Sequence, residues 1–208
     1  YQMRNWYYFH WLCGDHIVEQ HIHNLDVCNW IMNDTPAAAE GMGGRQVRVG
    51  KEFGEIYDHH SVEFTYANGV KLLSQCRHIP NCLDNVSEHA HGAHGWADVS
   101  AARIVARGWE WRFEGAAQDP YQQEHDDLFA AIREGKAYNE AETGAKSTMT
   151  SILGRMATYS GRSVSWDEAL ASSMAYRPTK HAWDGVPPTL PVAHGFYPVA
   201  MPGIAPAW

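Results

Sequence analysis

An acid, an imidazole, a second acid and an indole recur at helical spacing near the start of the chain, as Glu19, His23, Asp26 and Trp30. Residues three or four positions apart lie on one face of an α-helix, so these side chains are predicted to form a polar column. An imidazole between carboxylates can exchange protons near neutral pH, because the reference pKa of histidine is about 6.5 and a nearby anion favours the charged form. The column fits acid–base chemistry, and the same pattern is also typical of a solvated helix face.

One helix over residues 15–30 is predicted to carry this column. Asp15 follows Gly14 and is suited to cap the first turn. An apolar stripe at spacings of four, three and three supports the same helix, and it consists of Val18, Ile22, Leu25 and Cys28.

Strands are predicted in the next part of the chain. The small, Gly-rich residues 33–44 are predicted to be a connector that leads into a short strand at 46–49. Alternating apolar residues on both sides of Asn68-Gly69 predict a β-hairpin. Residues 79–95 are predicted to be irregular, and residues 96–105 and 109–113 to form two further antiparallel strands.

Helices are predicted to follow the strands. Asp119 and Pro120 provide a cap and a first helical residue, and Gly135 ends that helix. A second helix is predicted at 141–159, and a shorter one from Ser165. Beyond residue 176 prolines exclude regular structure, and they occupy positions 178, 187, 188, 191, 198, 202 and 206.

This order of elements predicts an α+β fold, with a mainly antiparallel open β-sheet and helices on one face. We expect residues 1–176 to form the domain and residues 177–208 to form a Pro-rich extended arm over it or over a neighbouring subunit. The sequence GMGG at 41–44 leads into a predicted strand and not a helix, so it is no GxGxxG fingerprint. The chain is therefore predicted to contain no cofactor-binding residues. Because it opens at Tyr1, a front part is expected to be missing.

Composition excludes several classes of partner. The net charge is −8 and no dense Lys/Arg run occurs, so nucleic acid is not expected as a partner. No apolar run approaches the roughly 20 residues that cross a membrane, and the aromatic start is not that of a signal peptide. The spacing of the cysteines fits no zinc motif and indicates free thiols, which favours a reducing compartment such as the cytoplasm; they are Cys13, Cys28, Cys76 and Cys82.

Histidines raise the alternative of a metal site. His21 and His23 would face different sides of a helix, and His59 and His60 would face opposite sides of a strand, so neither pair can chelate one ion. The loop histidines at 89–94 could wrap a cation, but a solvated loop is the favoured interpretation. No metal site is therefore predicted, while a metal-dependent enzyme that uses Glu19, His23 and loop histidines stays open as an alternative.

Two segments together resemble a known family. GDHIVEQHIHNLDVCNWI at 14–31 and the stretch from 119 to 170 are similar to the C-terminal domain of the Gfo/Idh/MocA oxidoreductases, which include glucose-fructose oxidoreductase and inositol dehydrogenase. The family's helix carries an acid and, four residues on, a histidine, which Glu19 and His23 match, with Glu where Asp is common. The resemblance implies an N-terminal dinucleotide-binding domain, with a Glu-Lys-Pro motif, that has no counterpart in this chain. It also implies dimers or tetramers formed through the sheet.

From this resemblance we expect the substrate-binding and oligomerisation domain of an NAD(P)-dependent oxidoreductase acting on a sugar, polyol or related hydroxyl compound. His23 would take the hydroxyl proton, and Glu19 would orient or polarise the imidazole of His23. Asp26 and Trp30 would contact the substrate. NAD or NADP would bind the full-length enzyme, and the isolated chain is expected to be inactive and to bind no cofactor. A non-catalytic assembly module is a further alternative, because aromatic residues and the proline arm could bury apolar surface against another chain.

Overall fold

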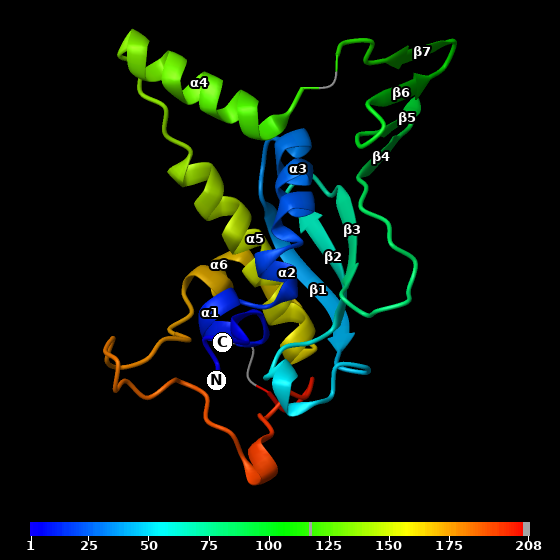
Figure 1. The fold of residues 1–208 in the computed structure, drawn as a ribbon. Coiled ribbons are helices and arrows are strands. Elements are labelled where there is room, and N and C mark those ends of the chain that lie inside the picture. Colours follow the sequence, from blue (N-terminus) through cyan, green and yellow to red (C-terminus); the bar gives the residue numbers. More distant parts are fainter. Residues whose placement is uncertain (117, 206–208) are drawn as a thin grey trace. The chain divides into compact units, whose positions relative to one another are not determined.

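A computed structural model of the protein describes residues 1–116 and 118–205. The chain forms two compact units: the first comprises Tyr1–Leu83 and the residues from Lys146 onward, and the second is Asp84–Ala145. Each unit contains a four-stranded antiparallel sheet and at least one helix (Figure 1). The predicted α+β class with mainly antiparallel strands is therefore confirmed.

The sheet of the first unit has the strand order β3-β2-β1-β8. Its strands are β1 (Pro36–Gly44), β2 (His59–Tyr66), β3 (Lys71–Arg77) and the short β8 (Val164–Ser165), and neighbours pair antiparallel. β2 and β3 form the predicted hairpin, and its turn contains Gly69 with φ +84°, a left-handed conformation that glycine adopts without strain.

The predicted connector at 33–44 is wrong, because most of it is the central strand β1. Glycine allows the neighbouring backbone to approach: a Cβ at Gly41 would lie 2.5 Å from the carbonyl oxygen of Ser61. Residues 46–49, predicted as a strand, are irregular. Small residues thus mark a closely paired strand here and not a linker.

The predicted helix over 15–30 is divided in two. α2 spans His16–Glu19 and α3 spans Ile22–Met32, with Gln20 and His21 between them. Before α2 lie a 3₁₀ turn, η1 (Trp6–Tyr8), and the short helix α1 (His10–Cys13). The helix break therefore falls between Glu19 and His23.

The hydrophobic core of the first unit lies between β2 and the helices α3 and α5 (Ala141–Ser160). Alternate residues of β2 are buried from His60 to Tyr66, and those between them are more exposed. Side chains from α2, α3, α5 and the strands meet in one cluster, which includes Ile17, Leu25, Val62, Phe64, Leu153, Met156, Ala157 and Val164.

The second unit consists of a four-stranded meander and a helix. Its strands are β4 (His89–Gly92), β5 (Gly95–Asp98), β6 (Arg103–Ala106) and β7 (Trp109–Arg112), in sequential order. The single strand predicted over 96–105 is thus two strands, and β4 lies in a segment that was predicted to be irregular. The helix α4 (Pro120–Glu134) begins and ends as predicted, since Asp119 caps it and Gly135 follows with φ +66°.

The chain after α5 contains little regular structure. A capping box at Ser165 opens α6 (Trp166–Leu170), and only the 3₁₀ turn η3 (Ala193–Gly195) follows in the described residues. The arm lies on its own unit, because the amide of Gly203 donates to the carbonyl oxygen of Ser160 at 2.8 Å and the Tyr57 hydroxyl donates to that of Ala200 at 2.9 Å. In the described part of the chain no helix is long and apolar enough to cross a membrane.

A glycine in the middle of α5 is required by core packing. In Gly154→Ala the new methyl would lie 2.7 Å from Cζ of Phe64 and 3.1 Å from Cδ1 of Ile17, and both of these side chains are fully buried. We expect the substitution to lower the free energy of unfolding by about 1–3 kcal/mol, measured by urea denaturation.

Gly144, on the same helix, provides the matched control. A Cβ there would meet nothing within 4 Å, and alanine is favoured over glycine in helices by about 1 kcal/mol. Gly144→Ala should leave stability unchanged or raise it; equal loss of stability in both variants would contradict the packing argument.

Candidate active site

The structure separates the four residues of the predicted polar column. Glu19 ends α2 and is half-buried, whereas His23 in the first turn of α3 is exposed. Among the described residues no hydrogen bond or ion pair joins these two side chains. The hydroxyl of Ser147 in α5 donates to the half-buried carboxylate of Asp26, and Trp30 is 83% exposed.

Glu19 lies in an unusual environment for an ionisable side chain. Its Oε2 atom is buried and has no hydrogen-bond partner in the described residues. Such orphaned polar atoms are rare in folded proteins and call for an explanation, one of which is a functional role. Glu19 also acts on Tyr7: burial raises the pKa of the Tyr7 hydroxyl, and the negative charge of Glu19 raises that pKa further.

Two stacked histidines adjoin Tyr7. The Tyr7 hydroxyl oxygen lies 2.7 Å from Nδ1 of His16, and the rings of His16 and His78 are parallel within 6°, with centroids 4.5 Å apart. His78 Nε2 lies 3.0 Å from the carbonyl oxygen of Tyr57. Burial and the neighbouring His78 lower the pKa of His16 to about 3, so this ring is neutral at physiological pH.

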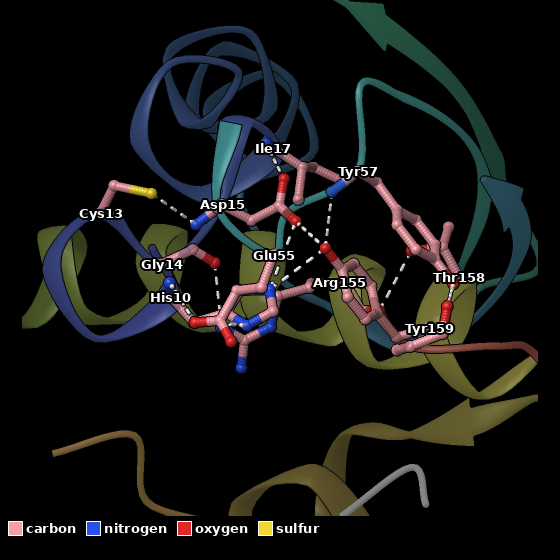
Figure 2. A network of polar contacts seen from close by, with 12 residues as sticks. His10, Cys13, Gly14, Asp15, Ile17, Glu55, Tyr57, Arg155, Thr158 and Tyr159 are labelled. Carbon is pink, nitrogen blue, oxygen red and sulfur yellow. Dashed lines mark hydrogen bonds and ion pairs between the residues drawn. The ribbon is translucent and has the colours of Figure 1, made fainter. Parts of the chain in front are cut away.

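A buried polar network centred on Asp15 lies at the start of α2 (Figure 2). Asp15 is fully buried, has φ +109° and accepts a hydrogen bond from the amide of Ile17 at 3.4 Å. Its Oδ1 lies 3.0 Å from Nε2 of His60, and its Oδ2 accepts from the hydroxyl of Tyr159 at 2.5 Å. Prediction recognised Asp15 only as a helix cap; its carboxylate also joins α2 to β2 and α5.

The network extends beyond the carboxylate through Tyr159 and His60. The Tyr159 hydroxyl oxygen accepts from the amide of Tyr57 at 2.8 Å and lies 3.1 Å from Nε2 of His10. His60 Nδ1 lies 3.0 Å from the hydroxyl oxygen of Thr158. All these groups are buried, so the network is a scaffold beside Glu19 and not an open reaction site.

Electrostatics favours the ionised form of Asp15. Burial opposes ionisation, but the charge of His60 and hydrogen bonds from His10 and His60 outweigh it and hold the pKa of Asp15 well below its usual range. For Tyr159, burial and then the Asp15 charge raise the pKa well above its usual value. The network therefore contains a carboxylate that stays charged and a tyrosine that stays protonated.

A small cavity of about 160 Å³ is lined in part by Tyr159. It is lined by residues of α5 and of the segments that follow it, namely Arg155, Met156, Tyr159, Met174, Tyr176, Ala200 and Ala205. The guanidinium of Arg155 lies 4.9 Å from the ring centre of Tyr176 and donates to the carbonyl oxygen of Gly14 at 2.9 Å. The guanidinium of Arg155 therefore already has partners within the protein.

The histidine pairs do not converge on a metal site. His60 turns inward to Asp15, while His59 contacts Asp58 at 2.8 Å on the other side of the strand. His21 Nε2 lies 2.8 Å from the hydroxyl of Ser74. No group of three or more His, Cys, Asp or Glu residues within the described ranges is arranged to hold a metal ion.

Comparison with known proteins gives structural matches only. No protein-family model and no curated protein sequence matches the chain. Aldose-aldose oxidoreductase from Caulobacter crescentus, solved with glycerol, is 19% identical with a TM-score of 0.64, and the match covers 77% of this chain and 50% of that one. The chain has the fold of the Gfo/Idh/MocA C-terminal domain.

Other structures with the Gfo/Idh/MocA fold agree. A putative myo-inositol dehydrogenase from Sinorhizobium meliloti is 18% identical with a TM-score of 0.54, covering 74% of this chain and 51% of that one. GenD2 from gentamicin A biosynthesis, solved with NAD, is 16% identical with a TM-score of 0.55, covering 77% and 51%. The chain thus spans about half the length of the structures it matches.

Loss of the Asp15 charge should destabilise the protein in a pH-dependent manner. Asp15→Asn leaves His60 and Tyr159 without their buried anion, and breaking such a buried pair costs about 3–5 kcal/mol. Because the pKa of Asp15 is lowered on folding, its contribution is complete above the unfolded pKa of about 3.9 and is lost as pH falls below that value. Between pH 7 and pH 3 the free energy of unfolding, measured by urea denaturation, should fall less in the variant than in the wild type.

Asp119→Asn is the control, since Asp119 also caps a helix but is exposed. Asparagine caps helices as well as aspartate does, so this variant should retain both the stability and the pH profile of the wild type. An unchanged pH profile in Asp15→Asn would show that the buried carboxylate is not the stabilising group.

Proposed function

We propose that the chain is the substrate-binding and oligomerisation part of an NAD(P)-dependent oxidoreductase acting on a sugar, polyol or related hydroxyl compound. The fold shared with aldose and inositol oxidoreductases supports this class. The observation that carries the proposal is the half-buried Glu19 at the end of α2, whose buried Oε2 lacks a hydrogen-bond partner in the described residues, one helix break before the exposed His23.

The residues of this chain fit the substrate side of the reaction and not the nucleotide side. GMGG forms the end of β1 and pairs along its length with β2, so it is not a loop between a strand and a helix that could cradle a pyrophosphate. A separate dinucleotide-binding domain would hold NAD or NADP, which supplies the hydride acceptor when bound. The orphaned Oε2 of Glu19 indicates that a polar partner from outside these residues completes the site.

In the proposed reaction, His23 accepts the proton of the substrate hydroxyl on an imidazole nitrogen. The exposure of His23 leaves this ring free to reach a substrate. Glu19 orients the imidazole and stabilises its charged form. Asp26, held by Ser147, and the exposed indole of Trp30 are proposed to contact the substrate.

Assembly is proposed to use the face of the first sheet that points away from the core. Met42 on β1 is 78% exposed and Leu73 on β3 is 74% exposed. Large apolar side chains on an open sheet face are typical of surfaces that pair with another subunit. A homo-oligomer in a reducing compartment also agrees with the free cysteines of the described chain.

A non-catalytic assembly module is the second candidate function. Exposed aromatic side chains favour it, among them Trp109 and Trp111 on β7 and Trp183 in the arm. The two functions differ in one respect, because only the oxidoreductase depends on the imidazole of His23.

His23→Ala tests the proposed role in a protein that carries this chain together with the proposed dinucleotide-binding domain. Loss of a general base lowers kcat by about 10²–10⁴-fold, and because His23 is exposed its removal should leave the melting temperature unchanged. Activity is measured as NADH or NADPH formation with polyol and aldose substrates.

His125→Ala is the matched control, because His125 is also an exposed histidine in a helix. It should retain wild-type kcat. Equal activity of the two variants would remove His23 from the mechanism and favour the assembly module.

A further inference from the structure

His60 is a buried histidine whose two ring nitrogens both have polar partners, and the proposed reaction does not use it. The residue lies on β2 and is 3% exposed. Its Nε2 lies 3.0 Å from Oδ1 of Asp15 at the start of α2. Its Nδ1 lies 3.0 Å from the hydroxyl oxygen of Thr158 in α5. One imidazole thus connects the sheet to two helices.

The hydroxyl proton of Thr158 already has an acceptor. The hydroxyl donates to the carbonyl oxygen of Arg155, one turn earlier in α5, at 3.0 Å. A carbonyl oxygen can only accept, and a hydroxyl has a single proton, so the Thr158 oxygen can form a second hydrogen bond only as an acceptor. The contact with His60 therefore requires a proton on Nδ1 of the imidazole.

Thr150, two turns earlier in α5, has the same arrangement with an amide as the donor. Its hydroxyl donates to the carbonyl oxygen of Lys146 at 3.0 Å and accepts from Nδ2 of Asn29 at 2.9 Å. An amide nitrogen can only donate, so this threonine must accept. Thr150 and Thr158 are both fully buried, and the ring of His60 takes at Thr158 the place that the Asn29 amide takes at Thr150.

The other ring nitrogen faces a carboxylate. Both oxygens of Asp15 accept hydrogen bonds, Oδ1 from the amide of Ile17 at 3.4 Å and Oδ2 from the hydroxyl of Tyr159 at 2.5 Å. The pKa of Asp15 lies well below its usual range, so the carboxylate is ionised. An ionised carboxylate has no proton to donate. The contact with His60 therefore requires a proton on Nε2 as well.

We propose that His60 is an imidazolium that positions α2: its Nδ1–H donates to the Thr158 hydroxyl and its Nε2–H donates to the Asp15 carboxylate. The buried cation and anion form an ion pair between β2 and the start of α2. Because α2 is a single turn that ends at Glu19, the pair also fixes where that carboxylate starts. The proposal rests on the proposed function only for what Glu19 does in catalysis, since the proton count follows from the contacts.

The groups packed around His60 leave Asp15 as its counter-charge. The rings of Tyr57, before β2, and Tyr159, in α5, lie 5.7 and 6.1 Å from the His60 ring, and Cys76 is its register partner on β3. Burial raises the pKa of both tyrosines and of the thiol. These three groups therefore stay uncharged near neutral pH.

Two further histidines lie near Asp15. Nε2 of His10 is farther from this carboxylate, at 3.7 Å from Oδ2, and its Nδ1 faces a second acid, 3.5 Å from Oε1 of Glu55. His16 is neutral, because burial lowers its pKa to about 3. His60, at 3.0 Å, is therefore the histidine that pairs directly with Asp15.

The ¹⁵N chemical shifts of the His60 ring test the proposal in the 208-residue chain at pH 7.5. A histidine with the ordinary pKa of about 6.5 is mostly neutral at this pH, and protonated and unprotonated ring nitrogens give well-separated shifts. Through-bond correlations from the backbone assign the ring signals. We expect both nitrogens of His60 to be protonated in the wild type.

Thr158→Val removes the acceptor of the Nδ1 proton with little change in shape. We expect His60 in this variant to lose that proton and become a neutral Nε2–H ring, and the ¹³C signal of the Glu19 carboxyl group to shift as α2 loses its ion pair. Thr150→Val is the matched control, because it removes an equally buried hydroxyl from the same helix that contacts Asn29 and not His60. It should leave both sets of signals unchanged.

Three results would overturn the proposal: an unprotonated Nδ1 of His60 in the wild type, an Nδ1–H that Thr158→Val leaves in place, or a Glu19 signal that does not respond when that proton is lost. The amide signals of the β2–β3 hairpin report in each sample that the fold is intact. If His23→Ala left activity intact while His60 and Glu19 behaved as expected, the proposed function would fail and the positioning role would stand.

Discussion

The buried carboxylate of Asp15 is the constraint on which the first unit depends. It accepts hydrogen bonds within α2 and from α5 and pairs with His60 of β2, so one side chain sets the position of three elements. Its φ of +109° is an uncommon conformation for a residue with a side chain and costs of order 1–3 kcal/mol, so it persists only because the surrounding contacts hold it. The hydrogen bond of Arg155 to the Gly14 carbonyl adds a second restraint at the same point.

This constraint also determines where the proposed chemistry lies. α2 has a single turn, so an anchor at Asp15 places both His16 and Glu19 at its two ends. The helix break then turns α3, with His23 on its exposed surface. A scaffold that is buried and charged thus supports a neighbouring acid whose Oε2 still lacks a partner in the described residues.

Local signals in the sequence predicted the elements whose ends are set locally. The Asn68-Gly69 turn, the cap at Asp119 and the stop at Gly135 each act within a few residues, and the structure has all three as expected. β1 was not predicted, because its small residues are required by the close approach of β2. The sequence of one segment does not show which other segment packs against it.

The candidate site could be predicted only in part, for the same reason. The spacing of Glu19 and His23 is visible in the sequence, but the break between them is not. Asp15 resembles an ordinary cap, since its partners His60 and Tyr159 lie 45 and 144 positions away. Nothing in the spacing of Tyr7 connects it to His16, and only the folded chain shows that their side chains lie 2.7 Å apart.

A crystal structure of this chain together with the proposed dinucleotide-binding domain, oxidised nicotinamide cofactor and a bound polyol would test the central claim most directly. The account predicts a substrate hydroxyl within hydrogen-bond distance of His23, with the Glu19 carboxylate beside the imidazole. A polyol bound elsewhere, with His23 facing bulk solvent while the cofactor is in place, would contradict it.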